Sequence, residues 1–391
     1  MKRVLVLNHF AADPSSPGGT RHVEMFSRLR GWSYLIAAGN HAVVDDTPKP
    51  SKIGYLALPT LPFSGNGINR IANWASYAAS AIARLSRGSR PDVVYASSPH
   101  LLAGLAGYIL SKRWRVPFVL EVRDLWPQVL VDMGQMEATS PVYRTLENLE
   151  SFLYGKADKI VVMAQGTRDH LLARGVPPAR IDLIPNAADP DDFVVDTPRK
   201  SLRERFGFTR FTCVYTGAHG PANGLDLLLD AAADLADEDL DIFLVGNGPW
   251  KPALQARTRD LGLRNVHFLD PIPKTDIPSL LAAADIGLHV LADVPLFRYG
   301  VSPNKVFDYL AAGLPMVTNV PGEVAALVTE SGGGLATEPT GLAEGIRELA
   351  HQSPHQLAAM GTSGRDFMRL HRSRTLMASR LQTLLDNLVG T

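Results

Sequence analysis

Short apolar runs alternate with segments of helical periodicity along the whole chain, and this alternation strongly limits the possible folds. Each run is short enough for a buried strand, and most intervening segments carry apolar residues three or four positions apart. The runs lie at 4–7, 93–95, 118–122, 160–162, 212–215, 242–245, 266–268, 286–290 and 316–317. Such alternation is typical of parallel sheets wound on both faces by helices, with the ligand beyond the carboxyl ends of the strands.

The length of 391 residues favours two domains of this kind. A turn-rich, acidic segment over 185–192 precedes a polar helix at 199–206 and a new strand at Phe211, so we expect the break there. We therefore predict an N-terminal domain over 1–190 and a second domain over 195–371. The amphipathic helical pattern of 365–388 predicts a terminal helix, and we expect its part from 372 to 391 to return to the first domain.

Composition excludes several protein classes. The single cysteine, Cys213, lies in an apolar run and has no partner for a disulfide or a metal site, which fits a core residue in a reducing compartment. No window approaches the roughly 20 apolar residues of a membrane span, and the apolar run after Met1 is too short for a signal peptide. No basic stripe interleaved with aromatic residues suggests nucleic-acid binding. We expect a cytoplasmic protein.

Charge is unevenly spread although the net charge is zero. Residues 1–190 contain 21 lysines and arginines against 15 acidic residues, a net charge of +6, and the remainder carries −6. A basic N-terminal half can meet a phosphate-bearing acceptor or, peripherally, the inner face of an anionic membrane. The Ala-rich helix expected over 68–85 carries Trp74 and Tyr77, for which core packing is favoured over a membrane- or acceptor-facing position.

The segment 302–315 reads as a loop, a short helix and the start of a strand. Ser302 and Pro303 form a helix start, and Gly313 with Pro315 ends the helix. The helix start, with Asn304 and Lys305 in its first turn, suits an anion. Asp308 follows about one turn on, where a carboxylate can accept from two neighbouring hydroxyls. A ligand with a phosphate next to a diol matches a nucleotide sugar, so the segment predicts a nucleotide-sugar site. The alternative interpretation of the segment is an ordinary αβ unit with a solvated Lys and Asp.

Glycine-rich loops follow three of the predicted strands. Gly18 and Gly19 follow the first strand, Gly217 and His219 follow the first strand of the second domain, and Gly246 and Asn247 follow the next. Glycines let a backbone approach a ligand closely, although any one such loop is a turn as often as a site. All three loops and the Lys305 segment are predicted on the same side of their sheets, which makes the set more specific than its members.

Two adjacent charges, Arg123 and Asp124, end a further apolar strand. Charges in such a place are costly unless they are paired or functional, so a structural ion pair between them is the alternative to a site. The chain has no dinucleotide or phosphate-loop fingerprint, no nucleophile elbow and no zinc-protease motif. No Asp-x-Asp indicates a cation that would hold a diphosphate.

These features resemble the family 4 glycosyltransferases over nearly the whole chain. The shared motifs are Gly18-Gly19, Arg-Asp-Leu-Trp-Pro at 123–127, Ala-Asp-Lys-Ile-Val-Val at 157–162, Ile-Pro-Asn at 184–186, Tyr-Thr-Gly at 215–217, Val-Gly-Asn-Gly-Pro at 245–249 and Ala-Ala-Ala-Asp-Ile-Gly at 282–287. Arg-Asp-Leu-Trp-Pro and Ser-Pro-x-Lys-x-Phe-[Asp/Glu]-Tyr are similar to the branch of N-acetylfucosamine transferases of surface-polysaccharide clusters. The resemblance implies an α/β fold of the GT-B type, in which two Rossmann-like, doubly wound domains face each other.

The resemblance also implies site roles. Ser302, Pro303 and Lys305 would surround the donor diphosphate, Asn304 would also belong to the donor site, and Asp308 would hold the ribose hydroxyls. Gly18 and Gly19 would pack against the donor phosphates, and Gly217, His219, Gly246 and Asn247 would complete the donor site. Arg123 and Asp124 would lie near the sugar and act with Lys305 in catalysis. The position eight before Asp308 is Gly300, where the family has a Glu, and the basic residues of the wider family after Gly217 are absent, so Arg298 is a candidate helper.

The function implied is a retaining, metal-independent transfer from a nucleotide-diphosphate sugar, with UDP favoured over GDP and no separate cofactor. The acceptor expected is a glycan, a polyprenyl-linked sugar or a natural-product aglycone. Two alternatives stay open: a nucleotide-sugar epimerase or hydrolase of the same fold, and a catalytically silent partner subunit.

Overall fold

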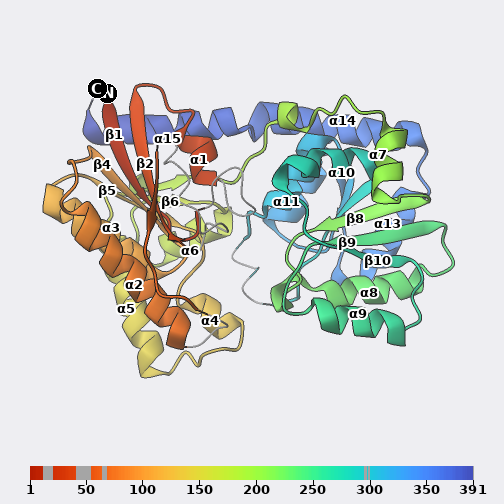
Figure 1. The fold of residues 1–391 in the computed structure, drawn as a ribbon, viewed down its shortest axis with the longest axis horizontal. Coiled ribbons are helices and arrows are strands. Elements are labelled where there is room, and N and C mark those ends of the chain that lie inside the picture. The colour runs from red at the N-terminus through yellow and green to blue at the C-terminus, as the bar shows by residue number, and fades with distance from the viewer. Residues whose placement is uncertain (12–20, 41–53, 64–67, 295–296, 298–299, 391) are drawn as a thin grey trace. The chain divides into compact units, whose positions relative to one another are not determined.

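The computed structural model describes residues 1–391 except 12–20, 41–53, 64–67, 295–296, 298–299 and 391. It divides into two compact units, an N-terminal unit of Met1–Pro185 with Thr375–Thr391 and a C-terminal unit of Asn186–Arg374. Each unit contains one parallel sheet with helices on both faces (Figure 1).

The N-terminal sheet has seven strands in the order β3-β2-β1-β4-β5-β6-β7, and every neighbouring pair is parallel. Its strands are β1 (Lys2–Leu7), β2 (Trp32–Gly39), β3 (Tyr55–Leu58), β4 (Val93–Ser98), β5 (Phe118–Val122), β6 (Lys159–Val162) and β7 (Ile181–Leu183). The chain runs outward from β1 to β3 and then returns beside β1 to build the other half. The loops after β1 and β4 therefore diverge, which leaves room for a ligand at that point.

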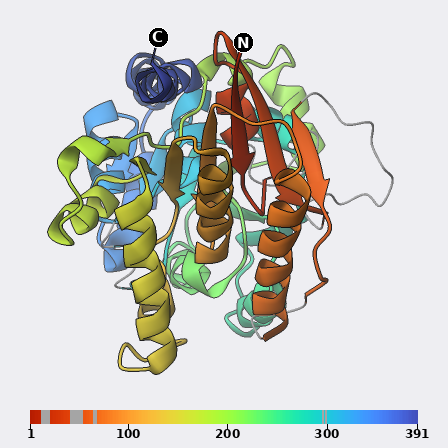
Figure 2. The ribbon, with the colours of Figure 1, turned by 90° about the vertical axis from the view of Figure 1, so that its left-hand side faces the viewer.

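Helices cover this sheet. They are α1 (Arg21–Phe26), α2 (Ile68–Leu85), α3 (Leu101–Trp114), α4 (Gln128–Asp132), α5 (Pro141–Lys156), α6 (Gln165–Ala173) and the 3₁₀ turn η2 (Pro178–Arg180). Figure 2 shows α2, α3 and α5 side by side across the sheet. Tyr77 of α2 is fully buried and its hydroxyl donates to the Ala37 carbonyl over 2.7 Å, so this residue packs in the core as expected.

The last helix, α15 (Arg374–Val389), packs on the N-terminal unit. Its Asp386 accepts hydrogen bonds from Lys2 Nζ and Trp32 Nε1, both over 3.1 Å. The Gln382 side chain accepts from the Arg30 backbone N–H over 2.9 Å. These contacts join the end of the chain to β1 and β2.

The C-terminal sheet has six parallel strands in the order β10-β9-β8-β11-β12-β13. They are β8 (Phe211–Thr216), β9 (Leu240–Val245), β10 (Val266–Leu269), β11 (Ile286–His289), β12 (Met316–Thr318) and β13 (Gly334–Ala336). The order reverses between β8 and β11, so the loops that follow these two strands lead in opposite directions. Cys213 is fully buried in β8, as its apolar neighbours predict.

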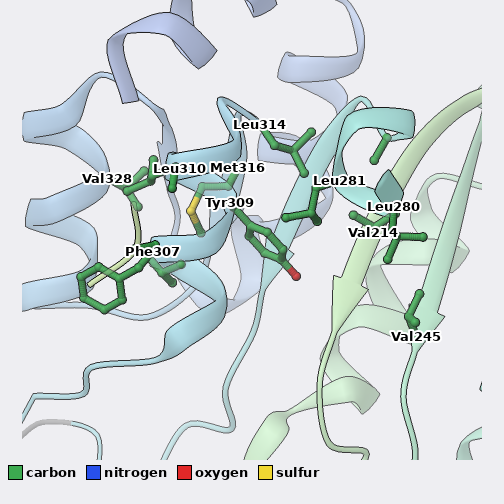
Figure 3. Packing of buried hydrophobic residues seen from close by; sticks show 14 of the residues in the cluster. Val214, Val245, Leu280, Leu281, Phe307, Tyr309, Leu310, Leu314, Met316 and Val328 are labelled. Carbon is green, nitrogen blue, oxygen red and sulfur yellow. The ribbon is translucent and has the colours of Figure 1, made fainter. Parts of the chain in front are cut away.

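Two apolar clusters enclose this sheet. One contains residues of α10, α11 and α14 (Figure 3), and the other contains residues of α8 and α13. The helices of the unit are α7 (Arg199–Phe206), α8 (Leu225–Asp234), α9 (Lys251–Asp260), α10 (Ile277–Ala283), α11 (Asn304–Ala312), α12 (Glu323–Ser331), α13 (Leu342–Ala350) and α14 (Pro354–His371). Short 3₁₀ turns are η3 (Pro190–Phe193), η4 (Pro221–Asn223), η5 (Lys274–Asp276) and η7 (Pro339–Gly341).

The predicted α/β class, with two doubly wound parallel sheets and a C-terminal helix, is confirmed. Over the described ranges, no helix combines the length and the apolar character needed to cross a bilayer.

Candidate functional site

The C-terminal unit brings several predicted donor-site residues to one edge of its sheet. Gly217 follows β8 directly, Gly246 follows β9, and Lys305 lies in the first turn of α11. All of them lie at the carboxyl edge, next to the reversal of strand order between β8 and β11. This is the place where open parallel sheets bind their ligands.

The two loops after β8 and β9 are in backbone contact. Gly217 has φ 147° and Gly246 has φ 149°, and a Cβ on Gly246 would lie 1.9 Å from the Gly217 carbonyl oxygen. A Cβ on Gly217 would lie 2.8 Å from Lys305 Nζ. Both positions therefore require glycine, because only a missing side chain allows this conformation and this approach.

Gly246→Ala is expected to destabilise the C-terminal unit and to weaken nucleotide binding, because one of the two loops must move. The clash should cost roughly 1–3 kcal/mol beyond the cost of an unfavourable φ alone. Gly262→Ala is the matched control, since Gly262 has φ 66° and open space around its missing Cβ. Thermal melts and nucleotide titrations of both variants measure the difference, and equal effects in the two would contradict the backbone contact.

Lys305 lies next to Gly217 and forms no ion pair with any residue that the structure describes. Its Nζ lies 3.7 Å from the centroid of the Tyr215 ring, so the aromatic face is its nearest favourable partner. The Nζ atom is shielded from solvent, and it makes no hydrogen bond to any described residue. Burial lowers the pKa of Lys305 to about 7.

Helix α11 reaches this position through Tyr309. The Tyr309 hydroxyl accepts a hydrogen bond from the Thr216 backbone N–H over 2.9 Å. The Tyr309 ring packs against Gly287 of β11, where a Cβ would come within 2.6 Å. Figure 3 shows Tyr309 among the buried residues of the apolar cluster. Because Lys305 precedes Tyr309 by four residues, the same helix face carries Lys305 to the sheet edge.

Ser302 does not cap α11, and this corrects the expected helix start. Pro303 occupies the N-cap position and the helix has no side-chain cap. The Ser302 hydroxyl instead accepts from the Asn186 N–H over 3.0 Å, and the Asn186 amide donates to the Ser302 carbonyl over 2.6 Å. Tertiary contact to the Ile-Pro-Asn segment has replaced the local cap, and Asn304 is exposed.

The remaining predicted donor residues occupy different environments. His219 is fully buried, whereas Asn247 is exposed and its carbonyl accepts from the His219 N–H over 2.9 Å. Asp308 is half-buried in the second turn of α11. The predicted residues Gly18, Gly19 and Arg298 lie outside the described residues.

In the N-terminal unit, a buried carboxylate organises the carboxyl edge of the sheet. Glu121 is the next-to-last residue of β5, has 1% of its surface exposed, and accepts from Arg21 Nε (3.2 Å) and His22 Nε2 (2.9 Å). Tyr95 and Ser97 of β4 also donate to it, over 2.6 and 2.9 Å. Burial opposes the charge, but His22 and Arg21 outweigh it and hold the pKa of Glu121 well below its usual range. The sequence reading missed this residue as a site element.

Arg123 and Asp124 follow Glu121 in the chain. Arg123 Nη1 lies 4.0 Å from Glu121 Oε1, within the range of an ion pair. Among the described residues, Arg123 forms this ion pair with Glu121 and none with Asp124. Asp124 is exposed beyond the strand end. The guanidinium therefore lies near the buried carboxylate. Although Asp124 keeps exposed surface, desolvation raises the pKa of its carboxyl against the opposing charge of Arg123.

Two buried histidines lie at the point where the N-terminal strand order reverses. His9 Nδ1 lies 2.8 Å from His100 Nε2, and His100 Nδ1 accepts from the Ala103 N–H. His100 must then carry its proton on Nε2 and donate it to His9. Burial, and next Arg70, lower the pKa of His100 to about 3, so the ring is neutral. His100 therefore offers a neutral hydrogen-bonding group, and the two rings are stacked, His9 on Tyr77 and His100 on Trp74.

Comparisons with known proteins identify glycosyl transferase domains in both halves of the chain. Residues 23–187 match a glycosyl transferase 4-like domain, and residues 210–352 match glycosyl transferases group 1. A probable glycosyltransferase of Pseudomonas aeruginosa, WbjE, is 28% identical over 277 residues, which are 68% of this chain and 67% of that protein.

Solved structures show the same fold at low identity. Sucrose-phosphate synthase from Thermosynechococcus elongatus has a TM-score of 0.79 at 16% identity, and the match covers 99% of both chains. Anabaena HepE in complex with UDP-glucose has a TM-score of 0.73 at 19% identity, and the match covers 99% of this chain and 100% of that one. Among the residues that the structure describes, no group of three metal-ligating side chains is found.

Proposed function

This chain is a glycosyltransferase of GT-B fold, with a glycosyl transferase 4-like domain followed by a group 1 domain, and we propose that it is a retaining, metal-independent enzyme. Its donor is a nucleotide-diphosphate sugar, with UDP favoured over GDP. Its acceptor is a glycan, a lipid-linked sugar or a small molecule.

One observation carries the donor proposal. Lys305 Nζ is buried at the strand-order reversal, beside backbone that only glycine can form, and it lacks a counter-charge among the described residues. An unpaired buried ammonium is costly unless a ligand supplies the negative charge. A diphosphate supplies that charge, and Lys305 can then stabilise the leaving nucleotide as the glycosidic bond stretches. The complex of HepE with UDP-glucose supports UDP as the first nucleotide to test.

Asp308 supports the nucleoside part of the proposal. It lies about one turn beyond Lys305 on α11, so a ligand with its diphosphate at Lys305 extends its ribose toward the carboxylate. A carboxylate accepts hydrogen bonds from two vicinal hydroxyls.

The acceptor belongs to the N-terminal unit in this proposal. Arg123 lies near Glu121 at the carboxyl edge of that sheet, and Asp124 is exposed next to it. The net charge of +6 over residues 1–190, from 21 basic and 15 acidic residues, favours a phosphate-bearing acceptor such as a polyprenyl-linked sugar. Such an acceptor would bring the protein to the inner face of a membrane, in agreement with the surface-polysaccharide branch that the motifs resemble.

Calorimetric titration with UDP, GDP and dTDP tests the donor site. We expect UDP to bind most tightly and to keep its affinity in the presence of a chelator. Incubation of the UDP-sugars with lipid-linked and soluble acceptors, read by NMR of the product anomer, then tests retention. Binding of none of the three nucleotides would overturn the proposal in favour of a silent partner subunit. Conversion of the donor without any acceptor would favour the epimerase or hydrolase.

A further inference from the structure

At the same edge of the C-terminal sheet, three side chains carry buried nitrogen atoms that have no hydrogen-bond partner among the described residues. They are Lys305 at Nζ, His219 at both ring nitrogens and His289 at Nε2, and no described residue satisfies these atoms. His219 and His289 are both 0% exposed. A buried polar atom without a partner typically costs about 1–3 kcal/mol, and such atoms are rare in native proteins. Three together indicate a ligand that would satisfy them.

The fold directs His289 toward Lys305. His289 ends β11 two residues after Gly287, so both face the same side of the sheet. Gly287 packs against Tyr309, and Lys305 lies one turn before Tyr309 on α11. The first turn of α11 therefore lies over the end of β11. Burial, and next the charge of Lys305, lower the pKa of His289, and the contribution of Lys305 agrees with this placement.

Thr318 fixes the orientation of His289. Its Oγ1 lies 2.9 Å from His289 Nδ1 and already accepts from the Val320 N–H over 3.2 Å. The hydroxyl proton of Thr318 is then available to His289 Nδ1, so the ring proton stays on Nε2. His289 consequently presents an N–H donor at the atom that has no protein partner.

His219 is held from the opposite loop. Its backbone N–H donates to the Asn247 carbonyl, and its own carbonyl accepts from Trp250. A Cβ on Gly246 would lie 3.4 Å from His219 Nε2, so the ring lies against the same glycine backbone that borders Lys305. His219 and Lys305 therefore lie near the two glycines Gly217 and Gly246.

The charged and titratable groups packed around the three side chains are Tyr215 of β8, Lys251 of α9, and Asp308 and Tyr309 of α11. Lys251 donates to Asp270 over 2.8 Å and, with Lys305, lowers the pKa of His219, although burial is the larger cause. The pKa of His219 is about 4, and that of His289 is well below its usual range. The free site is therefore mostly deprotonated above neutral pH.

We propose that Lys305, His219 and His289 together recognise the diphosphate of the donor, and that the nucleotide binds with net uptake of a proton from solution. This inference rests on the proposed function and deepens it. The negative ligand replaces the missing counter-charge, so the ammonium form of Lys305 becomes favoured on binding. The proton passes from the buffer to Lys305 Nζ, and no other bond changes.

Titration calorimetry with UDP in two buffers of different ionisation enthalpy measures this uptake. At about pH 8 the terminal phosphate of UDP is already ionised, so any proton taken up is bound by the protein. With a pKa of about 7, Lys305 is mostly deprotonated at that pH, so we expect net uptake that approaches one proton per UDP. Equal heats in the two buffers would overturn the inference and leave the donor site standing. Absence of any binding would instead overturn the proposed function.

Variants separate the three side chains. Lys305→Arg keeps a permanent charge and should bind UDP with uptake near zero, while Lys200→Arg, on an exposed residue of α7, should keep the wild-type uptake. His289→Leu removes the unsatisfied nitrogen, so we expect a melting temperature at or above wild type and roughly tenfold weaker UDP binding. Uridine, which lacks phosphate, should bind the wild type and His289→Leu equally. A His289→Leu protein that loses affinity for uridine and UDP alike would contradict a diphosphate contact.

Discussion

Lys305→Met is expected to lower kcat by two to three orders of magnitude while raising the stability of the unliganded protein. Loss of one preorganised donor at a developing negative charge costs roughly 2.7–4 kcal/mol of barrier. The same substitution removes a buried ammonium that has no counter-charge among the described residues. Burial lowers the folded-state pKa of Lys305 from 10.5 to about 7, so its charge destabilises the fold below pH 10.5. Turnover assays and thermal melts at pH 7 measure the two opposite effects.

Two further measurements show that charge is the cause. In the wild type, kcat/KM should fall as pH rises above about 7, because the free enzyme then loses the Lys305 proton. Lys305→Arg should lack this fall, since a guanidinium stays charged. Lys200→Met, on an exposed position, should leave both turnover and the pH profile unchanged. A Lys305→Met protein with near-normal kcat would contradict the assignment of Lys305 to the leaving group.

The central strands could be predicted from the sequence because they are apolar on both faces. In β4, for example, all six residues of Val93–Ser98 are buried, so the run is visible without any knowledge of its neighbours. The strands missed were β2, β3, β7 and β13. β3 and β13 are partly exposed, and β7 has only three residues, one of them Asp182. At these positions the strand is defined by the partner to which it pairs, which local pattern cannot show.

The position of the candidate donor residues was predictable where the pattern is local. Gly217 and Gly246 directly follow strands and Lys305 lies in the first turn of a helix, so their position at the carboxyl edge follows from the fold class. His289 was missed because its role depends on tertiary contacts: Thr318 orients its ring, and α11 brings Lys305 near it. The cap predicted for Ser302 was wrong for a related reason, because the Ser302 hydroxyl accepts a hydrogen bond from the backbone N–H of Asn186, 116 residues earlier.

Glu121 shows how a site residue escapes a reading of the sequence altogether. It lies in the apolar run of β5, and its partners Arg21 and His22 come from α1, 100 and 99 residues away. Arg21 also donates to the carbonyls of Pro185 over 2.8 Å and Ile184 over 2.6 Å. The Glu121 carboxylate thus connects α1, β4 and β5 by hydrogen bonds. Arg21 connects the same group to the backbone of Ile184 and Pro185.

Glu121→Ala is expected to cost about 3–5 kcal/mol of the stability of the N-terminal unit, the usual effect of breaking a buried ion pair by removing one partner. Arg21, with 6% of its side chain exposed, would lose its carboxylate. The hydroxyls of Tyr95 and Ser97 would lose their acceptor as well. Loss of this size should lower the melting temperature of this unit by roughly 10 °C. Differential scanning calorimetry in the presence and absence of UDP separates this transition from that of the nucleotide-binding unit.

A matched control and a pH series distinguish a buried charge from a general packing defect. Glu147→Ala removes a carboxylate 3.8 Å from Arg174 with 39% of its side chain exposed, and it should change stability by less than about 0.5 kcal/mol. Glu121→Gln keeps the shape of the side chain and removes its charge. Because the folded-state pKa of Glu121 is lowered, the contribution of its charge is complete above the unfolded value near 4.5 and declines as pH falls toward the folded value. The gap between wild type and Glu121→Gln should therefore be larger at pH 7 than at pH 4, and a gap that does not change with pH would show that the carboxylate contributes by shape alone.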